Sequence, residues 1–322
     1  MLTTRLFALA SLLPSLLMLG SACDVSEIGD DLGAIELRPF GCSACGNGFG
    51  NSPVVNGNTL QSFSLDGTFN EDGVRFIGAE FPGKPRFDIS VDPVTEQWIV
   101  TEPGTGTVKY SGAELLGARL VLESADEEVS LEIVEVDTAV PSWSDSGEVV
   151  TAYRAVYKGP QGQMLSVCPS LALDEQWFVL IAGETYHQDA QLVQSRPSWV
   201  TLACAGQAAA KMKLLGYHAA SSTQPDIDAR KATLRMITAD YCGTGQSFTV
   251  AGTHVAWRDR ALTVQPQFDE ISIEAMWGPN GAICLTHPRH VERVQVEDAC
   301  DIPLCAGEDF GEKAIWRTML PQ

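Results

Sequence analysis

Nine cysteines give this chain its strongest constraint on folding. Cys23 lies in the N-terminal segment discussed below, and the other eight can form pairs. In an exported protein an even set of cysteines is typical of a disulfide framework. Eight cysteines allow about a hundred pairings, so the sequence alone does not fix them. We favour four pairs between neighbours in the sequence: Cys42–Cys45, Cys168–Cys204, Cys242–Cys284 and Cys300–Cys305.

Residues 1–22 predict an export signal. Arg5 precedes an apolar run over residues 6–19, and small residues then lead to Cys23. The run is short for a membrane span and has the order of a secretory signal peptide. Gly20-Ser21-Ala22-Cys23 resembles a bacterial lipobox, although Gly20 stands where leucine is usual. We predict lipidation of Cys23, and ordinary signal cleavage nearby is the alternative.

The charge of the chain argues against one class of partner. There are 21 Lys+Arg against 41 Asp+Glu, which gives a formal net charge of −20. Nucleic-acid binding needs clustered positive charge to displace counterions, so that function is excluded.

We expect an extracytoplasmic protein of the bacterial cell envelope, either on the outer membrane or facing the periplasm. An N-terminal lipid would attach it, and its ligand would be a protein or a glycan.

Residues 23–53 are polar and Gly-rich, and they predict a tether between the lipid and the folded part. Cys42 and Cys45 form a Cys-x-x-Cys motif within it. A redox role would need a strand followed by a helix. Gly46 and Asn47 do not favour a helix, so a structural clip is the preferred interpretation.

Residues 54–165 predict a β-rich domain, a sandwich or a barrel. Short runs of strand-forming residues recur there, separated by turn pairs such as Asp66-Gly67 and Asp72-Gly73. Such spacing is typical of antiparallel folds.

Residues 166–322 predict a Cys-rich α+β domain stapled by disulfides. Helices are expected over residues 205–215 and from 226 to about 241, since apolar residues recur there with helical period. The segment Gly278-Pro279-Asn280-Gly281 predicts a hairpin between two strands.

Asp240 falls within the apolar stripe of the second predicted helix. A buried carboxylate needs hydrogen-bond donors, and the backbone amides of Gly243, Thr244 and Gly245 follow directly. We predict that Asp240, Gly243 and Gly245 are structural residues, with the carboxylate folding back onto the turn. A buried acid with a raised pKa, ready for proton transfer, is the alternative.

Three groups of residues carry a family resemblance over roughly residues 150 to 295. They are Leu202-Ala203-Cys204, Ala239-Asp240-Tyr241-Cys242-Gly243, and Glu274-Ala275-Met276-Trp277-Gly278-Pro279-Asn280-Gly281 with Cys284. In these the chain resembles bacterial lipoproteins with an ADYC domain, many of them from myxobacteria. The resemblance implies an exported domain and brings no defined activity and no catalytic residue.

The search for reactive groups gives weak candidates. Ser247 and His254 could join Asp240 as a triad only if folding brought them together. His287 and His290 could bind a metal, but Pro288 lies between them and a solvated loop is preferred. We expect no cofactor and no metal.

Two functions therefore stay open. The preferred one is a lipid-tethered, non-catalytic module for binding or envelope structure. The alternative is an extracytoplasmic hydrolase with a site near Asp240, Ser247 and His254.

Overall fold

The computed structural model describes residues 51–56, 62–124, 127–169, 176–187, 194–265, 271–307 and 310–321. All of these described residues belong to one compact unit. Cys23, Cys42 and Cys45 lie outside the described residues, so lipidation and the Cys-x-x-Cys clip stay predictions.

Eight of the described strands form one antiparallel sheet, in the order β1-β11-β10-β8-β7-β6-β2, with β9 pairing β8. The β-rich character predicted for the chain is therefore confirmed. The predicted division at residue 165 falls inside this sheet, because the apolar strands β10 and β11 pair with β8 and β1. The strands are β1 (Ser62–Ser64), β2 (Val74–Glu80), β6 (Arg119–Ser124), β7 (Glu127–Pro141), β8 (Val149–Lys158), β9 (Met164–Ser166), β10 (Phe178–Thr185) and β11 (Gln194–Cys204).

The two end strands of this sheet approach each other around a buried core. Phe63 of β1 and Phe76 of β2 have ring centroids 4.6 Å apart. A smaller antiparallel sheet packs on the same core and contributes Trp98, whose ring lies 5.2 Å from that of Phe76. It consists of β3 (Asp88–Val91), β4 (Trp98–Thr101) and β5 (Val108–Ser111), followed by the 3-10 helix η1 (Gly112–Leu115).

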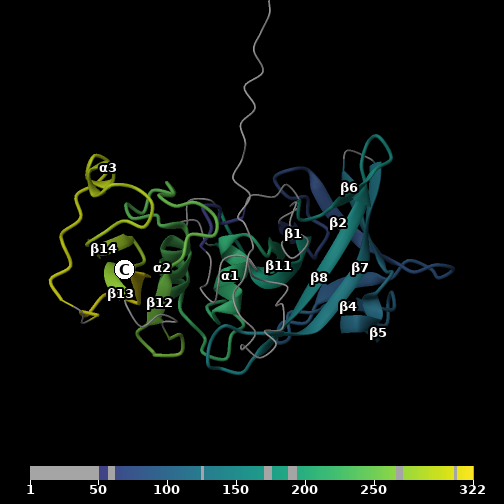
Figure 1. Ribbon diagram of the computed structural model, residues 1–322. Coiled ribbons are helices and arrows are strands. Elements are labelled where there is room, and N and C mark those ends of the chain that lie inside the picture. The colour runs from purple at the N-terminus through teal and green to yellow at the C-terminus, as the bar shows by residue number, and fades with distance from the viewer. Residues whose placement is uncertain are drawn as a thin grey trace, which may run out of the picture. The chain divides into compact units, whose positions relative to one another are not determined.

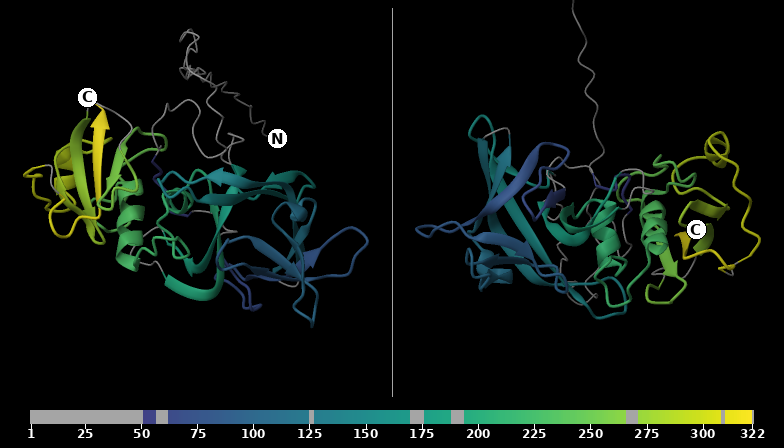
Figure 2. Two further views of the ribbon diagram at one scale, coloured as in Figure 1. Left: turned by 90° about the horizontal axis from the view of Figure 1, so that it is seen from below. Right: turned by 180° about the vertical axis from the view of Figure 1, so that it is seen from behind.

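A pair of helices and a third, four-stranded sheet share another core with the large sheet (Figures 1 and 2). The helices are α1 (Ala208–Leu214) and α2 (Ile227–Thr238). The four-stranded antiparallel sheet has the order β12-β15-β13-β14. Its strands are β12 (Ala256–Asp259), β13 (Ile271–Gly278), β14 (Gly281–Leu285) and β15 (Trp316–Pro321), and the short α3 (Arg293–Glu297) follows β14.

Helix α2 is buried on nearly every side in its second half. Arg235 and Thr238, which helical periodicity places on a wet face, are 1% and 3% exposed. Both are buried because α2 packs against α1 and also against the four-stranded sheet. Asp226 caps the helix by accepting a 2.7 Å bond from the amide of Ala229.

The described segment over residues 51–56 docks on the start of α1. The first amides of a helix lack partners within the helix, and here Ala208 and Ala209 donate to the carbonyls of Val54 and Val55 at 2.9 and 3.0 Å. Lys211 donates from Nζ to the carbonyl of Asn51 at 2.9 Å. The predicted end of the tether at residue 53 therefore falls inside the folded unit.

A buried charge cluster connects the β3–β4 turn to α1. Glu96 is 1% exposed, and its Oε2 lies 2.5 Å from Lys213 Nζ and 2.8 Å from His218 Nδ1. Its Oε1 accepts a 2.7 Å bond from the amide of Ala182 in β10. Burial raises the pKa of Glu96, but the charges of Lys213 and His218 outweigh it and lower that pKa to about 2.

A second buried ion pair lies between β10 and α2. Arg230 Nη2 is 2.5 Å from Glu184 Oε1, and the hydroxyl of Tyr186 donates to Glu184 Oε2 at 2.7 Å. The two clusters join the large sheet to both helices through charged groups that water does not reach.

The described cysteines form three disulfides: Cys168–Cys204, Cys242–Cys300 and Cys284–Cys305. The first is the pair predicted. The predicted pairs Cys242–Cys284 and Cys300–Cys305 were wrong, because the segment after α3 runs back along β14. There the amide of Leu285 donates to the carbonyl of Pro303 at 2.9 Å, which brings Cys305 to Cys284. None of the described helices is long and apolar enough to cross a membrane.

The Glu96 cluster predicts a specific acid sensitivity. A folded-state pKa below the ordinary 4.5 gives stability that is present above that value and is lost as pH falls towards 2. Between about pH 5 and pH 2, the free energy of unfolding should fall by about 3 kcal/mol more in the natural protein than in Glu96→Gln. Urea unfolding at several pH values measures this difference.

Glu71→Gln, at an exposed turn position, serves as the control and should follow the natural protein. A constant gap between the natural protein and Glu96→Gln across this pH range would contradict the prediction.

Candidate functional site

Residues 239–245 form a tight turn directly after α2. Helix α2 ends at Thr238, and Ala239 adopts a left-handed conformation with φ 52° and ψ 39°. The amide of Asp240 then donates to the carbonyl of Arg235 at 2.9 Å. The helix is shorter than predicted, so Asp240 lies beyond its end and not on its apolar stripe.

Asp240 nevertheless has the donors that the sequence predicts. The amide of Thr244 donates to Oδ1 at 3.0 Å and that of Gly245 donates to Oδ2 at 2.9 Å. The side chain is buried. Burial raises the pKa of Asp240, while these backbone amides and the charge of Arg235 act in the opposite direction. The carboxylate thus holds the turn closed beneath the helix.

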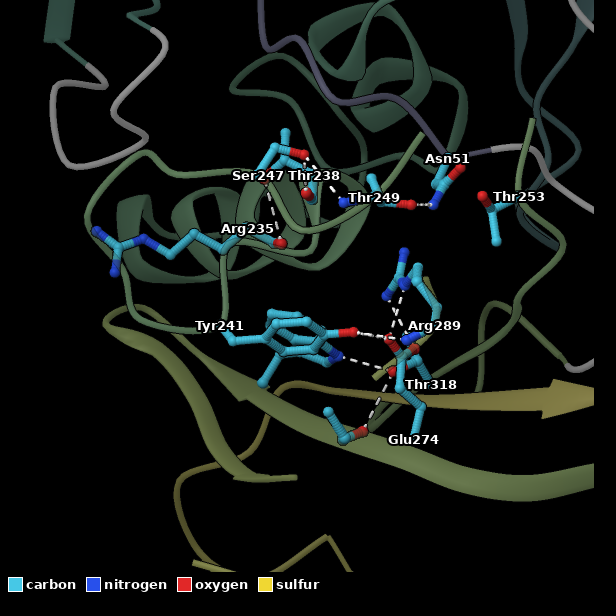
Figure 3. A network of polar contacts seen from close by, with 12 residues as sticks. Asn51, Arg235, Thr238, Tyr241, Ser247, Thr249, Thr253, Glu274, Arg289 and Thr318 are labelled. Atoms are coloured by element: carbon cyan, nitrogen blue, oxygen red, sulfur yellow. Dashed lines mark hydrogen bonds and ion pairs between the residues drawn. The ribbon is translucent and has the colours of Figure 1, made fainter. Parts of the chain in front are cut away.

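Tyr241 points into a buried ion pair at the four-stranded sheet (Figure 3). Its hydroxyl donates to Glu274 Oε1 and accepts a 3.0 Å bond from the amide of Arg289. Arg289 holds Glu274 through two bonds, Nε to Oε1 at 2.7 Å and Nη2 to Oε2 at 2.9 Å. Trp277 stacks on the Tyr241 ring with centroids 5.1 Å apart. Burial and the charge of Glu274 raise the pKa of Tyr241 well above its ordinary value.

Gly243 brings the turn against the β13–β14 hairpin. Its φ is +70°, and a Cβ there would overlap both the backbone carbonyl of Asn280 and the guanidinium of Arg235. The amide of Ala282 donates to the carbonyl of Tyr241 at 2.9 Å. Only a residue without a side chain permits this approach.

A pocket of about 420 Å³ lies beside this turn. One wall is residues 246–249, which follow the turn directly. The other wall comes from the segment after β14 and includes His290, Gln295 and Asp298. The buried Phe248 and the partly buried Val291 add apolar surface.

Three consecutive residues of the turn, Asp240, Tyr241 and Cys242, hold both walls of the pocket. Asp240 fixes the turn that leads into residues 246–249. The bonds from Tyr241 and Glu274 fix Arg289, the neighbour of His290. The disulfide Cys242–Cys300 ties the turn to the end of the opposite wall.

The first wall is also tied to the helix and to the docked N-terminal segment. The hydroxyl of Ser247 donates to the carbonyl of Thr238 at 2.7 Å, and Asn51 Nδ2 donates to Thr249 Oγ1. Figure 3 shows both contacts above the Tyr241 network.

Three side chains that line the pocket are not used inside the fold. Gln246, His290 and Asp298 are exposed, and their side chains make no hydrogen bond or ion pair with other described residues. Gln295 differs, since its Oε1 accepts a 2.9 Å bond from the amide of Glu292, which leaves its amide hydrogens available. The pocket therefore offers both donors and acceptors to a ligand.

Ser247 and Asp240 both bond to backbone atoms, which is not the arrangement of a catalytic triad. The Ser247 hydroxyl donates to a backbone carbonyl, and both oxygens of Asp240 accept backbone amides. Neither arrangement would activate the serine as a nucleophile. Among the residues described, no group of three histidine, cysteine or acidic side chains has the geometry of a metal site, and this includes His287 and His290.

Sequence reasoning missed Glu274, Arg289 and the pocket. Glu274 is a fully buried acid between Ile273 and Ala275 in β13, and such an acid needs a cationic partner. That need was a usable signal, but the sequence did not show that the partner would be Arg289.

Comparison with protein families identifies the family of this chain. A family model described as the ADYC domain matches residues 112–291, more than half of the chain. The matched region contains α1, α2, the turn over residues 239–245, Glu274 and Arg289. Neither the curated proteins nor the solved structures include a match to the chain.

Gly243 provides a test of this site. Gly243→Ala should reduce the free energy of unfolding by about 3 kcal/mol, because the new Cβ overlaps fixed backbone. The control is Gly67→Ala, where φ is +82° and no atom lies within 4 Å of a Cβ. It should lose only the conformational cost of about 1 kcal/mol. Equal losses in urea unfolding would show that the close approach at Gly243 is unimportant.

Proposed function

Since the chain belongs to the ADYC-domain family, we propose that it is an extracytoplasmic, lipid-anchored protein of the bacterial cell envelope that acts as a non-catalytic binding module. The three disulfides are consistent with an oxidising, extracytoplasmic location. The apolar leader and the Gly20-Ser21-Ala22-Cys23 sequence support export and acylation at Cys23.

One observation carries the proposal: the buried carboxylates of the site are used inside the fold, whereas three of the side chains that line the pocket have no partner among the described residues. Asp240 accepts two amides, and Glu274 is held by Arg289. Gln246, His290 and Asp298 have no such partners among the described residues. A concave site in which a few polar groups converge beside apolar surface is the usual form of a ligand site.

The hydrolase alternative has less support. A hydrolase needs a nucleophile in contact with a base, and the base held by a third group. The contacts of Ser247 and Asp240 are to backbone atoms, and these contacts favour a structural role for both.

The anchor can be tested at Cys23. In bacteria that process lipoproteins, the natural protein should fractionate with membranes, and its N-terminal peptide should carry acyl chains by mass spectrometry. Cys23→Ser should appear in the soluble fraction, since loss of the acyl chains removes stable attachment. A Cys23→Ser protein that stays in the membrane fraction would contradict the lipid anchor.

The binding function can be tested with that soluble Cys23→Ser chain and an isolated envelope fraction. Retention should weaken about tenfold when Gln246→Ala and His290→Ala are combined, because two ligand contacts are lost. Neither side chain has a described partner, so the fold should persist, and urea unfolding checks this. The control is Gln161→Ala, an exposed glutamine between β8 and β9. If retention of the double variant equals that of the control, the pocket is not the binding site.

A further inference from the structure

We propose that the pocket between residues 246–249 and the segment after β14 binds a neutral or amine-bearing saccharide unit of one or two rings. This inference rests on the proposed binding function and adds the chemical class of the ligand. It follows from the lining groups, from the charge around them and from how the walls are held.

The lining matches the hydrogen-bonding pattern of a sugar. Each sugar hydroxyl both donates and accepts, so it pairs well with side chains that do the same. Carboxamide, hydroxyl, imidazole and carboxylate groups surround the pocket, from Gln246, Ser247, Thr249, His290, Gln295 and Asp298. Ser247 and Thr249 have internal bonds, so the two glutamines, His290 and Asp298 would make the main contacts.

Charge separates this ligand class from anionic ones. The described residues that line the pocket include neither lysine nor arginine, whereas Asp298 contributes a carboxylate. The chain as a whole carries a formal net charge of −20. Arginine and lysine make the strongest bonds to phosphate, sulfate and acidic sugars, and the Asp298 carboxylate would repel these anions. An amine would be attracted by Asp298.

The apolar lining and the size fit the same class. Phe248 lies at the pocket with its side chain largely buried, and Val291 lies on the other wall. Together they offer apolar surface to the C–H face of a sugar ring. A volume of about 420 Å³ lies in the lower part of the range for small-molecule sites.

The walls are fixed before a ligand arrives. The Asp240 turn and the Ser247 bond hold one wall. The other wall is held at one end by Arg289 and at the other by Cys242–Cys300. Arg293 also donates to the carbonyls of Leu285 and Ile302. Prior ordering lowers the cost of binding, which matters for a small ligand with few contacts.

Three probes with one ring and different charge test the inference: glucose, glucosamine and glucuronic acid. Ligand-observed NMR titrations of the mature chain in detergent should show saturable, millimolar binding of glucose, tighter binding of glucosamine and none of glucuronic acid. Combining Gln246→Ala with His290→Ala should abolish binding, while Gln161→Ala should leave it unchanged.

Asp298→Asn supplies a sharper readout. It should retain glucose binding and lower the preference for glucosamine over glucose by about two- to five-fold, the effect expected for an exposed charge pair. A loss of fold would instead reduce binding of both sugars equally and would appear in urea unfolding.

The failures can be told apart. If no sugar binds while envelope retention still depends on Gln246 and His290, the saccharide class is overturned and the binding function stands. If retention is also unaffected, both proposals fail. Binding of glucuronic acid as tight as that of glucose would overturn the charge argument and with it the ligand class.

Discussion

The carboxylate of Asp240 is the group on which the motif region depends. It is buried beyond the end of α2 and receives the amides of Thr244 and Gly245. A carboxylate without these donors would be costly in such a place. These bonds hold the chain reversal that follows α2. The reversal positions Tyr241, which bonds to Glu274, and Cys242, which pairs with Cys300. The turn, the ion pair and the disulfide share this origin.

Two buried charge clusters have a similar task, one at the small sheet and one beside this turn. Glu96 with Lys213 and His218 connects the small sheet to α1, and Glu274 with Arg289 connects the four-stranded sheet to the motif turn. Buried ion pairs add little net stability compared with apolar packing, but a missing partner is strongly destabilising. Such clusters therefore favour one arrangement of the elements over others, which is what a pocket with fixed walls requires.

The sequence predicted the β-rich character, the β13–β14 hairpin, the Cys168–Cys204 pair and the amide donors of Asp240. These are local features, apart from Cys168–Cys204, which joins cysteines 36 residues apart. The errors concern contacts made by tertiary packing, such as the pairing of Cys242 with Cys300 across 58 residues. Glu274 and Arg289 were missed for the same reason, because an isolated strand does not show which cation will reach its buried acid.

The distribution of polar groups bears on what the motif does. Catalysis needs a group whose reactivity is raised and which also faces the substrate. At the turn after α2, Asp240 and Tyr241 have raised pKa values, and both are buried and used by backbone amides and by an ion pair. Gln246 and Gln295, which line the pocket, carry carboxamides that can form hydrogen bonds. Residues 239–245 hold the walls of the pocket but do not line it. Under the proposed function, the choice of ligand would therefore depend on the lining residues within 246–249 and 290–298.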